Sequence, residues 1–189
     1  PTGLYITIGA LSIGVVLLLC AIFLLMRRYR RRLRNTQQQL ERDEVTGLGN
    51  FDYFQRYYRQ LVNDRNRVLY TLIFFYVDTD RLRRLSDTQE LEEALRFCAV
   101  VLQEYAGDTD ILAKVSEHGF VLLKLSGNTE QLQSWVETIL QRLRAYPQVC
   151  SKDADIAAAA GLYPLRAGDR DLNEMIFNAE QEACHALKI

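Results

Sequence analysis

The sequence of 189 residues has little net charge, few cysteines and no internal repeat. Its formal net charge is -1 at pH 7, so the overall charge does not indicate a nucleic-acid partner. Its four cysteines include no C-x-x-C pair, and this spacing predicts neither a zinc site nor a disulfide framework. We therefore expect reduced thiols in a reducing compartment.

Charged side chains are also missing from the first 26 residues. As a helix, the apolar run from Leu4 to Met26 would span roughly 35 Å, enough to cross a bilayer core of about 30 Å. The length of this run without a polar face argues against a buried core helix, and a cleaved signal peptide would carry its basic residues before the apolar run. We therefore predict a transmembrane helix over residues 1–26.

An arginine cluster at residues 27–34 follows this run directly. By the positive-inside rule it stays in the cytoplasm, which predicts a single-pass protein of the inner membrane with its C-terminal domain cytoplasmic. The cluster is either a stop-transfer signal, which we favour, or a binding site for anionic lipid. Because the chain starts at Pro1 rather than Met, we expect a fragment of a longer protein whose preceding part is extracytoplasmic.

Residues 27–42 form a basic juxtamembrane linker with good helix formers and neither glycine nor proline. Met26, Leu33 and Leu40 recur every seven residues, as one line of a coiled-coil seam would. A second apolar line is missing. A homodimer through the linker and the following domain is therefore a hypothesis, besides the lipid bilayer as a partner.

Hydrophobic periodicity divides the remaining residues into alternating helices and strands. The predicted helices are 51–63, 90–105, 130–146 and one beginning after Asp171, and the predicted strands are 68–77, 111–115, 120–125 and 156–163. Their order predicts an α+β domain over residues 43–189. Its core would have ferredoxin-like connectivity, with an antiparallel sheet and helices on one face.

Several polar residues are candidates for chemistry. Asp78 and Asp80 end the strongest strand and are either Mg²⁺ ligands or turn residues. Glu117 and His118 are adjacent in the hairpin loop, where neighbouring side chains point in different directions, so a shared metal or acid–base site is disfavoured. His185 is expected to be exposed, and Asp108 and Asp110 to lie in a solvated loop.

Four landmarks in series resemble the GGDEF family, the diguanylate cyclase domain of bacterial signalling proteins. The opening D-x-L-T-G-L-x-N motif is matched at residues 43–50, and the D-x-D-x-F-K-x-x-N-D segment at residues 78–87. The signature hairpin corresponds to residues 115–123. The closing strand and helix resemble Ala159-Ala-Gly161 and Asn178-Ala-Glu180.

The resemblance implies a palm-type GGDEF fold and a reaction that joins two GTP molecules into cyclic di-GMP. It implies that Asp78 and the backbone carbonyl of Thr79 would hold Mg²⁺ if nucleotide is bound, with no other cofactor. It also places Arg83 where the family has a phosphate-binding lysine, and Ser86 and Glu92 in the nucleotide-binding segment.

The signature hairpin departs from the family at four of its five positions. Ser116, Glu117, His118 and Gly119 precede Phe120 where Gly-Gly-Asp/Glu-Glu-Phe is expected. A neutral imidazole is a poor Mg²⁺ ligand where the family has a carboxylate. Side chains at the first two positions also hinder the close approach of a nucleotide.

Three further elements depart from the family pattern. Ser86 replaces the asparagine that reads guanine, and the following segment is shortened, with Glu92 in place of its aspartate. The R-x-x-D inhibition motif reads Gly107-Asp-Thr-Asp110, and Leu187 replaces a phosphate-binding lysine, with Lys188 adjacent. Together these changes predict a degenerate, catalytically inactive domain.

We therefore expect a membrane-anchored GGDEF-like module that relays a signal to a partner or to a downstream effector in cyclic di-GMP signalling. The effector would be a phosphodiesterase (EAL) domain beyond Ile189, because the chain stops before the family's final strand. Two alternatives remain: an active diguanylate cyclase, and a sensor that binds GTP without turning it over.

Overall fold

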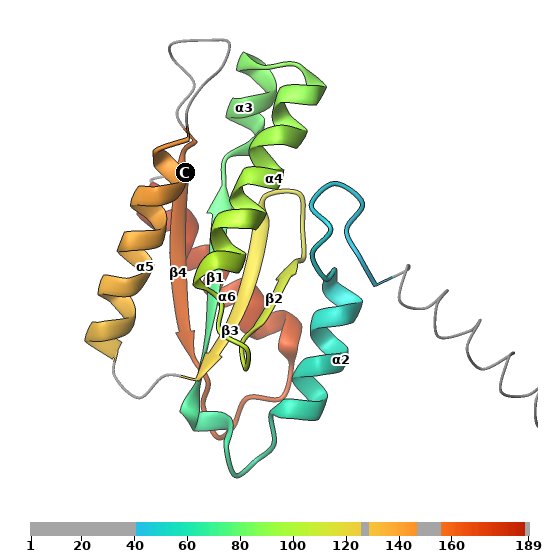
Figure 1. Ribbon diagram of the computed structural model, residues 1–189. Coiled ribbons are helices and arrows are strands. Elements are labelled where there is room, and N and C mark those ends of the chain that lie inside the picture. The colour runs from blue at the N-terminus through green and yellow to red at the C-terminus, as the bar shows by residue number, and fades with distance from the viewer. Residues whose placement is uncertain (1–40, 126–128, 147–155, 188–189) are drawn as a thin grey trace, which may run out of the picture. The chain divides into compact units, whose positions relative to one another are not determined.

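The computed structural model describes residues 41–125, 129–146 and 156–187 (Figure 1). The predicted membrane span over residues 1–26 and nearly all of the predicted linker lie outside these residues. Among the residues that are described, no helix is both long enough and apolar enough to cross a membrane. Residues 41–189 belong to one compact unit.

The described residues form an α+β domain with one antiparallel sheet, as the sequence predicts. Its elements in chain order are α2 (Phe51–Leu61), the short 3-10 helix η1 (Arg67–Leu69), β1 (Tyr70–Val77), α3 (Thr79–Leu85), α4 (Thr88–Tyr105), β2 (Ile111–Lys114), β3 (Gly119–Leu125), α5 (Thr129–Arg144), β4 (Ala158–Pro164) and α6 (Leu172–Leu187). The strand order β2-β3-β1-β4 is that of a ferredoxin-like sheet.

Strand β1 lies in the interior of the sheet, and every one of its residues is buried. It pairs with β3 from Tyr70 opposite Leu125 to Tyr76 opposite Gly119, and it pairs with β4 along its other edge. Its β-branched and aromatic residues suit a strand that is covered on both faces. The predicted strand began at Val68, but Val68 and Leu69 are in η1 and are more than half exposed.

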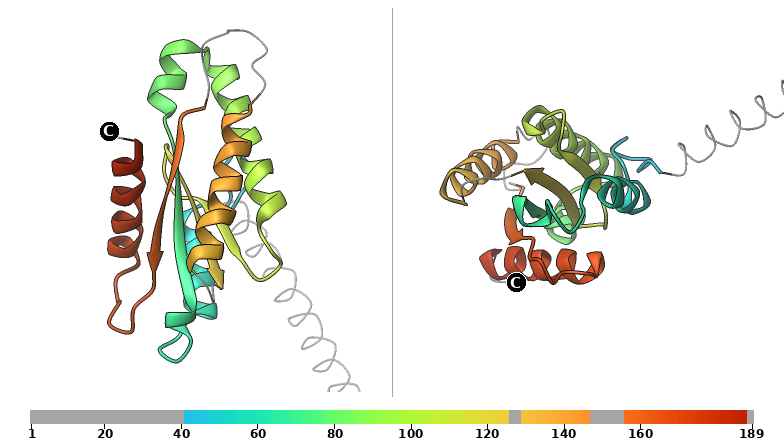
Figure 2. Two further views of the ribbon diagram at one scale, coloured as in Figure 1. Left: turned by 90° about the vertical axis from the view of Figure 1, so that its left-hand side faces the viewer. Right: turned by 90° about the horizontal axis from the view of Figure 1, so that it is seen from below.

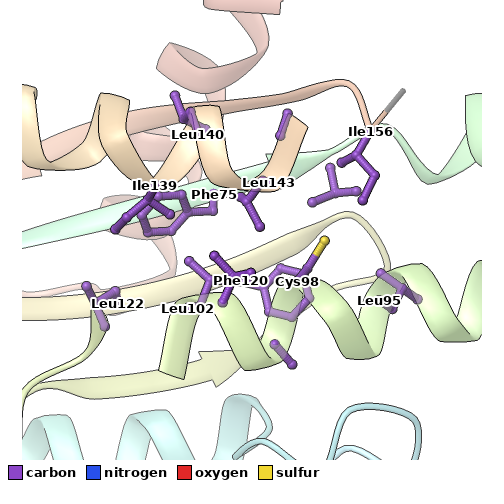
Figure 3. Close-up of a cluster of buried hydrophobic side chains, with 14 of the residues drawn as sticks. Phe75, Leu95, Cys98, Leu102, Phe120, Leu122, Ile139, Leu140, Leu143 and Ile156 are labelled. Carbon is purple, nitrogen blue, oxygen red and sulfur yellow. The ribbon is translucent and has the colours of Figure 1, made fainter. Parts of the chain in front are cut away.

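Helices cover both faces of the sheet (Figure 2). On one face, α4 and α5 pack on Ile73, Phe75 and Val77, which confirms the predicted placement of the two central helices. Figure 3 shows part of this core, in which Phe75 and Phe120 lie among leucine and isoleucine side chains of the helices. On the other face, α2 and α6 pack on the alternate β1 side chains, including Phe74 and Tyr76.

Helix α3 was not predicted from the sequence. It spans only Thr79–Leu85, too short for hydrophobic periodicity to be read. The signal that could have found it is Asp78, whose carboxylate caps the helix by accepting a hydrogen bond from the Arg81 amide at 2.9 Å. Helix α4 is capped in the same way, by a capping box between Asp87 and Glu90.

The opening motif folds into a turn that is joined to the sheet. The Asp43 carboxylate accepts hydrogen bonds from the amide (2.8 Å) and hydroxyl (2.6 Å) of Thr46, and Gly47 has a φ of 71°, which a glycine adopts without strain. Lys114 of β2 lies 3.5 Å from the Asp43 carboxylate, and its amide donates to the Gly49 carbonyl at 2.8 Å. The start of the domain is therefore fixed to an edge strand.

We expect Gly161→Ala to lower the free energy of unfolding by about 1–3 kcal/mol through overpacking. A Cβ at Gly161 would overlap the carbonyl oxygen of Ala179 in α6 and lie 2.7 Å from the amide nitrogen of Ala183. Urea unfolding followed by the fluorescence of Trp135 measures the change. Gly168→Ala is the control, since a Cβ there meets nothing within 4 Å, and its effect should stay within about 0.5 kcal/mol. Equal effects would refute this account of the close approach.

We expect Asp43→Asn to destabilise the domain at pH 7 but not in acid. Burial disfavours the Asp43 carboxylate, yet the hydrogen bonds from Thr46 and the charge of Lys114 outweigh it and hold the pKa of Asp43 below its usual value. A lowered pKa contributes stability above the unfolded value of about 4, and this contribution is lost as the pH falls through the folded value. The free energies of unfolding of the wild type and the variant should therefore converge as the pH is lowered from 7 to 2.5. Glu44→Gln, at an exposed neighbour, should show no such convergence.

Candidate functional site

The candidate site lies where β1 ends, between the β2–β3 hairpin and the start of β4. The Val77 amide donates to the carbonyl of His118 at 2.8 Å, and the Asp78 amide donates to the carbonyl of Ala157 at 2.9 Å. These bonds bring Asp78 and the hairpin loop side by side. One oxygen of the Asp78 carboxylate is engaged as the cap of α3.

The hairpin loop is bound to α3 through two of its side chains. Glu117 forms an ion pair with Arg83, which also lies 3.5 Å from the Asp80 carboxylate. His118 shares a hydrogen bond between its Nδ1 and the hydroxyl of Thr79, a fully buried residue. Glu117 and His118 thus have different partners and do not form a joint site. We call the ion pair and the hydrogen bond together the hairpin–α3 contacts.

The imidazole of His118 also stacks on the ring of Tyr76. The two ring centroids are 5.6 Å apart and their planes are inclined by 18°. Tyr76 comes from the face of β1 that packs against α6, so the stack joins the hairpin to that face. His118 therefore contacts both β1 and α3, and it fills space at the position where the family pattern has a metal-binding carboxylate.

The last two signature residues belong to the packing of the sheet. Phe120 is fully buried in the core beneath α4 and α5. A Cβ at Gly119 would overlap the ring of Phe74 and lie 2.7 Å from the Ser116 hydroxyl. Glycine at position 119 therefore allows Phe74 and Ser116 to approach each other at the base of the hairpin.

The electrostatic environment of the site is acidic around Tyr76. Burial raises the pKa of Tyr76, and the neighbouring Cys184, Asp78, Asp80 and Glu180 raise it further. Of these four groups, Asp78, Asp80 and Glu180 are carboxylates, whose negative charge disfavours the phenolate. Tyr76, the Thr79 hydroxyl and Glu180 lie at the site without having been predicted as site residues from the sequence.

A Mg²⁺ ion does not fit the residues that the structure brings together. Asp78 has one oxygen engaged as a helix cap, Glu117 of the hairpin is paired with Arg83, and His118 places an imidazole where the family has a carboxylate. No group of three or more histidine, cysteine, aspartate or glutamate side chains is placed to hold a metal ion within the described part of the chain. Asp80 is exposed and lies beside Arg83.

Each of the three predicted nucleotide-binding residues has a contact within the domain. Arg83 faces the hairpin, whereas Ser86 ends α3 by donating its amide to the Leu82 carbonyl at 2.8 Å. Glu92 accepts a hydrogen bond at 2.7 Å from Arg96, which in turn donates to the carbonyl of Val45 at 3.1 Å. In the structure, Glu92 thus supports the contact between α4 and the opening turn.

The remaining residues considered from the sequence lie in the loop before β2 and on helices α4 and α6. His185 is exposed, as predicted. Asp108 is exposed, but the prediction of a solvated loop is wrong for Asp110, because its side chain is only 3% exposed and pairs with Lys124 at 2.6 Å. Cys98 is buried, and burial raises the pKa of its thiol to about 12. A thiol with this pKa remains protonated and unreactive at neutral pH.

Residues 40–188 match a family model described as diguanylate cyclase, GGDEF domain. No curated protein sequence matches the chain. The match spans the opening turn, the hairpin and the final helix.

The fold is similar to solved diguanylate cyclase structures. Against SiaD of Pseudomonas aeruginosa, in complex with its activator SiaC, the TM-score is 0.68 at 17% identity, over 97% of this chain and 73% of SiaD. Against the coiled coil and GGDEF domain of DgcB from Caulobacter crescentus, in complex with cyclic di-GMP, it is 0.68 at 15% identity, over 90% of each chain. The S helix-GGDEF-EAL part of Vibrio cholerae LapD gives 0.65 at 12% identity, over 86% of this chain and 38% of that one. At these identities the likeness establishes the fold alone.

Double-mutant cycles test the hairpin–α3 contacts. For Thr79→Val with His118→Ala we expect a coupling energy of about 0.5–1.5 kcal/mol, the worth of one intramolecular hydrogen bond. For Arg83→Ala with Glu117→Ala we expect less than about 1 kcal/mol, falling further in 1 M salt, because both side chains are about half exposed. Urea unfolding of each single and double variant provides the values. Strictly additive effects in both cycles would mean that the hairpin is not held to α3.

Proposed function

The chain belongs to the GGDEF family, the diguanylate cyclase domain of cyclic di-GMP signalling, over residues 40–188, and we propose that it is a catalytically inactive member. In this proposal the domain is anchored in the inner membrane by residues 1–26 and lies in the cytoplasm. It relays a signal from the membrane side to a partner or to a downstream effector domain.

One observation carries the proposal of inactivity: the hairpin loop is bound to the chain's own α3 at the place where the reaction would need metal and phosphate. His118 is bonded to Thr79, and Glu117 is paired with Arg83, the residue expected to bind phosphate. Any triphosphate entering this site would have to displace the ion pair and would meet the negative charge of Glu117.

The hairpin also lacks the metal-binding carboxylate that the family pattern has at position 118. Phosphoryl transfer in such a site depends on hard oxygen ligands that hold divalent cations against the triphosphate. Neither Ser116 nor Gly119 supplies a second carboxylate to accompany Asp78, and Glu117 is turned towards Arg83. A site that keeps one carboxylate binds Mg²⁺ weakly, and without bound metal the 3′-hydroxyl has nothing to activate it.

The proposed relay rests on the sequence before the domain and on the start of the domain itself. The apolar run, the arginine cluster and the seven-residue spacing support a membrane helix that continues into a dimerising linker. The opening turn ties residues 43–50 to the edge strand β2 and to α4. A displacement of the linker would therefore be transmitted to the sheet that carries the hairpin.

The proposed partner is either a separate protein or an EAL domain that follows in the same polypeptide. SiaD was solved with a protein activator, and the LapD structure joins a GGDEF domain to an EAL domain. These arrangements belong to those proteins, and they support the proposal that the present domain acts through another protein rather than through its own chemistry.

A cyclase assay of the full chain, in detergent with GTP and Mg²⁺, tests the proposal. We expect no cyclic di-GMP above the level of the Asp78→Asn variant, which lacks the strand-end carboxylate. An active diguanylate cyclase assayed in the same detergent confirms that the assay detects product. Cyclic di-GMP formed by the wild type and abolished in Asp78→Asn would show that the chain is a cyclase and would overturn the proposal.

Calorimetry with GTP distinguishes a scaffold from a nucleotide sensor. We expect no binding at millimolar GTP, because Arg83, Ser86 and Glu92 are each engaged in a contact within the domain. Saturable binding that is lost in Arg83→Ala would instead assign the chain to GTP sensing without turnover.

A further inference from the structure

A groove of about 290 Å³ lies beside the hairpin, on the face of the sheet that α2 and α6 cover. Its apolar lining comes from three elements and the hairpin: Phe51 of α2, Phe74 of β1, Val115 of the hairpin, and Ile176 and Phe177 of α6. A volume of this size lies at or below the lower limit of ligand pockets, about 300 Å³, and suits one or two side chains of a protein partner rather than a nucleotide.

Phe177 is the exposed apolar side chain at this groove. It is 56% exposed, whereas the neighbouring Ile176 is buried. Helix α6 therefore has a large exposed aromatic ring at the edge of the groove. Phe74 forms the floor of the depression and is fully buried. Exposed aromatic rings next to apolar pockets are the usual anchors of protein interfaces.

The hairpin substitution at position 119 contributes to one wall of the groove. Because Gly119 has no side chain, the ring of Phe74 and the hydroxyl of Ser116 lie close together there, and both line the groove. The change that removes an acidic residue from the signature thus also shapes this surface.

The charge at the groove is negative. Glu180 is the one charged residue of its lining, and within the described ranges its carboxylate has no ion pair or hydrogen bond. The exposed Asp52 and Glu174 follow the lining residues Phe51 and Asn173 in the sequence, and no lining residue is basic. The acidic surroundings of the nearby Tyr76, to which Glu180 contributes, agree with this sign.

This charge decides between two kinds of occupant. A second copy of the chain, placed so that each Phe177 entered the other groove, would bring two Glu180 carboxylates together. Like charges placed close together in an interface oppose association. A partner with a basic residue next to an apolar side chain would fill the depression and neutralise Glu180.

We propose that the groove between α2, the hairpin and α6 is the docking site for a protein segment that presents an apolar side chain flanked by arginine or lysine. This inference rests on the proposed relay function and names the chemistry of its partner. The apolar side chain would lie on Phe74 and Phe177, and the cation would pair with Glu180.

Peptide titration of the full chain, in an uncharged detergent, tests the proposal by NMR. The probe is the blocked peptide Gly-Arg-Phe-Arg-Gly, compared with Gly-Glu-Phe-Glu-Gly and with Gly-Arg-Gly-Arg-Gly. We expect saturable shifts of the backbone amides of Ser116, Phe177 and Glu180 with the first peptide, and at least tenfold weaker binding of the other two. Because the detergent is the same in all titrations, partition into micelles does not mimic this pattern.

Matched variants separate the groove from general surface binding. Phe177→Ala should weaken the Arg-Phe-Arg peptide about tenfold, and Glu180→Gln roughly fivefold with loss of the preference over the Glu-Phe-Glu peptide. Val100→Ala and Glu104→Gln change an exposed apolar and an exposed acidic residue of α4, and both should leave binding unchanged. Phe177 and Glu180 are not fully buried, so their variants are expected to fold.

Two outcomes would overturn the inference. One is binding of equal strength by all three peptides, or shifts confined to residues outside the groove. The other is a shift of Phe177 and Glu180 that depends on protein concentration without peptide, which would assign the groove to a second copy. The cyclase assay of the same preparation measures activity separately from peptide binding. Failure of the proposed inactivity and failure of the proposed docking site can therefore be told apart.

Discussion

The burial of β1 on both faces, and its pairing along both edges, is the constraint on which the rest of the domain depends. A strand without an exposed residue needs helices above and below it, and the structure supplies α4 and α5 on one side and α2 and α6 on the other. Its pairing with β3 and β4 also determines what meets at its end. Asp78 and Thr79 lie beside the hairpin because the register places Tyr76 opposite Gly119.

The same geometry that would assemble a metal site in this fold here assembles contacts within the chain. A loop carrying carboxylates at the end of β1 would have to be held by metal or by solvent, because like charges repel. Here Glu117 pairs with Arg83, and His118 bonds to Thr79 and stacks on Tyr76. The polar side chains of the loop thus find their partners within the domain. The departure from the family signature and the contacts that hold the hairpin are therefore two consequences of the same substitutions.

Much of the fold could be read from the pattern of apolar residues, and much of the site could not. The continuous apolar run of β1 and the stripes of α4 and α6 predicted their elements to within a few residues. Helix α3 was missed because a helix of seven residues is too short for its period to be detected. Asp110 was misjudged because its partner, Lys124, lies on another strand, and only the hairpin brings the two together.

The sequence by itself determined the order of the longer helices and the strands, the family resemblance and the departures at positions 116–119, because these depend on residue types and their spacing along the chain. Only the tertiary structure decided what the departing residues do. Whether His118 faces solvent, metal or Thr79, and whether Phe177 lies beside a depression, depends on side chains from distant segments. Such contacts are set by packing in three dimensions, on which local patterns of hydrophobicity carry no information.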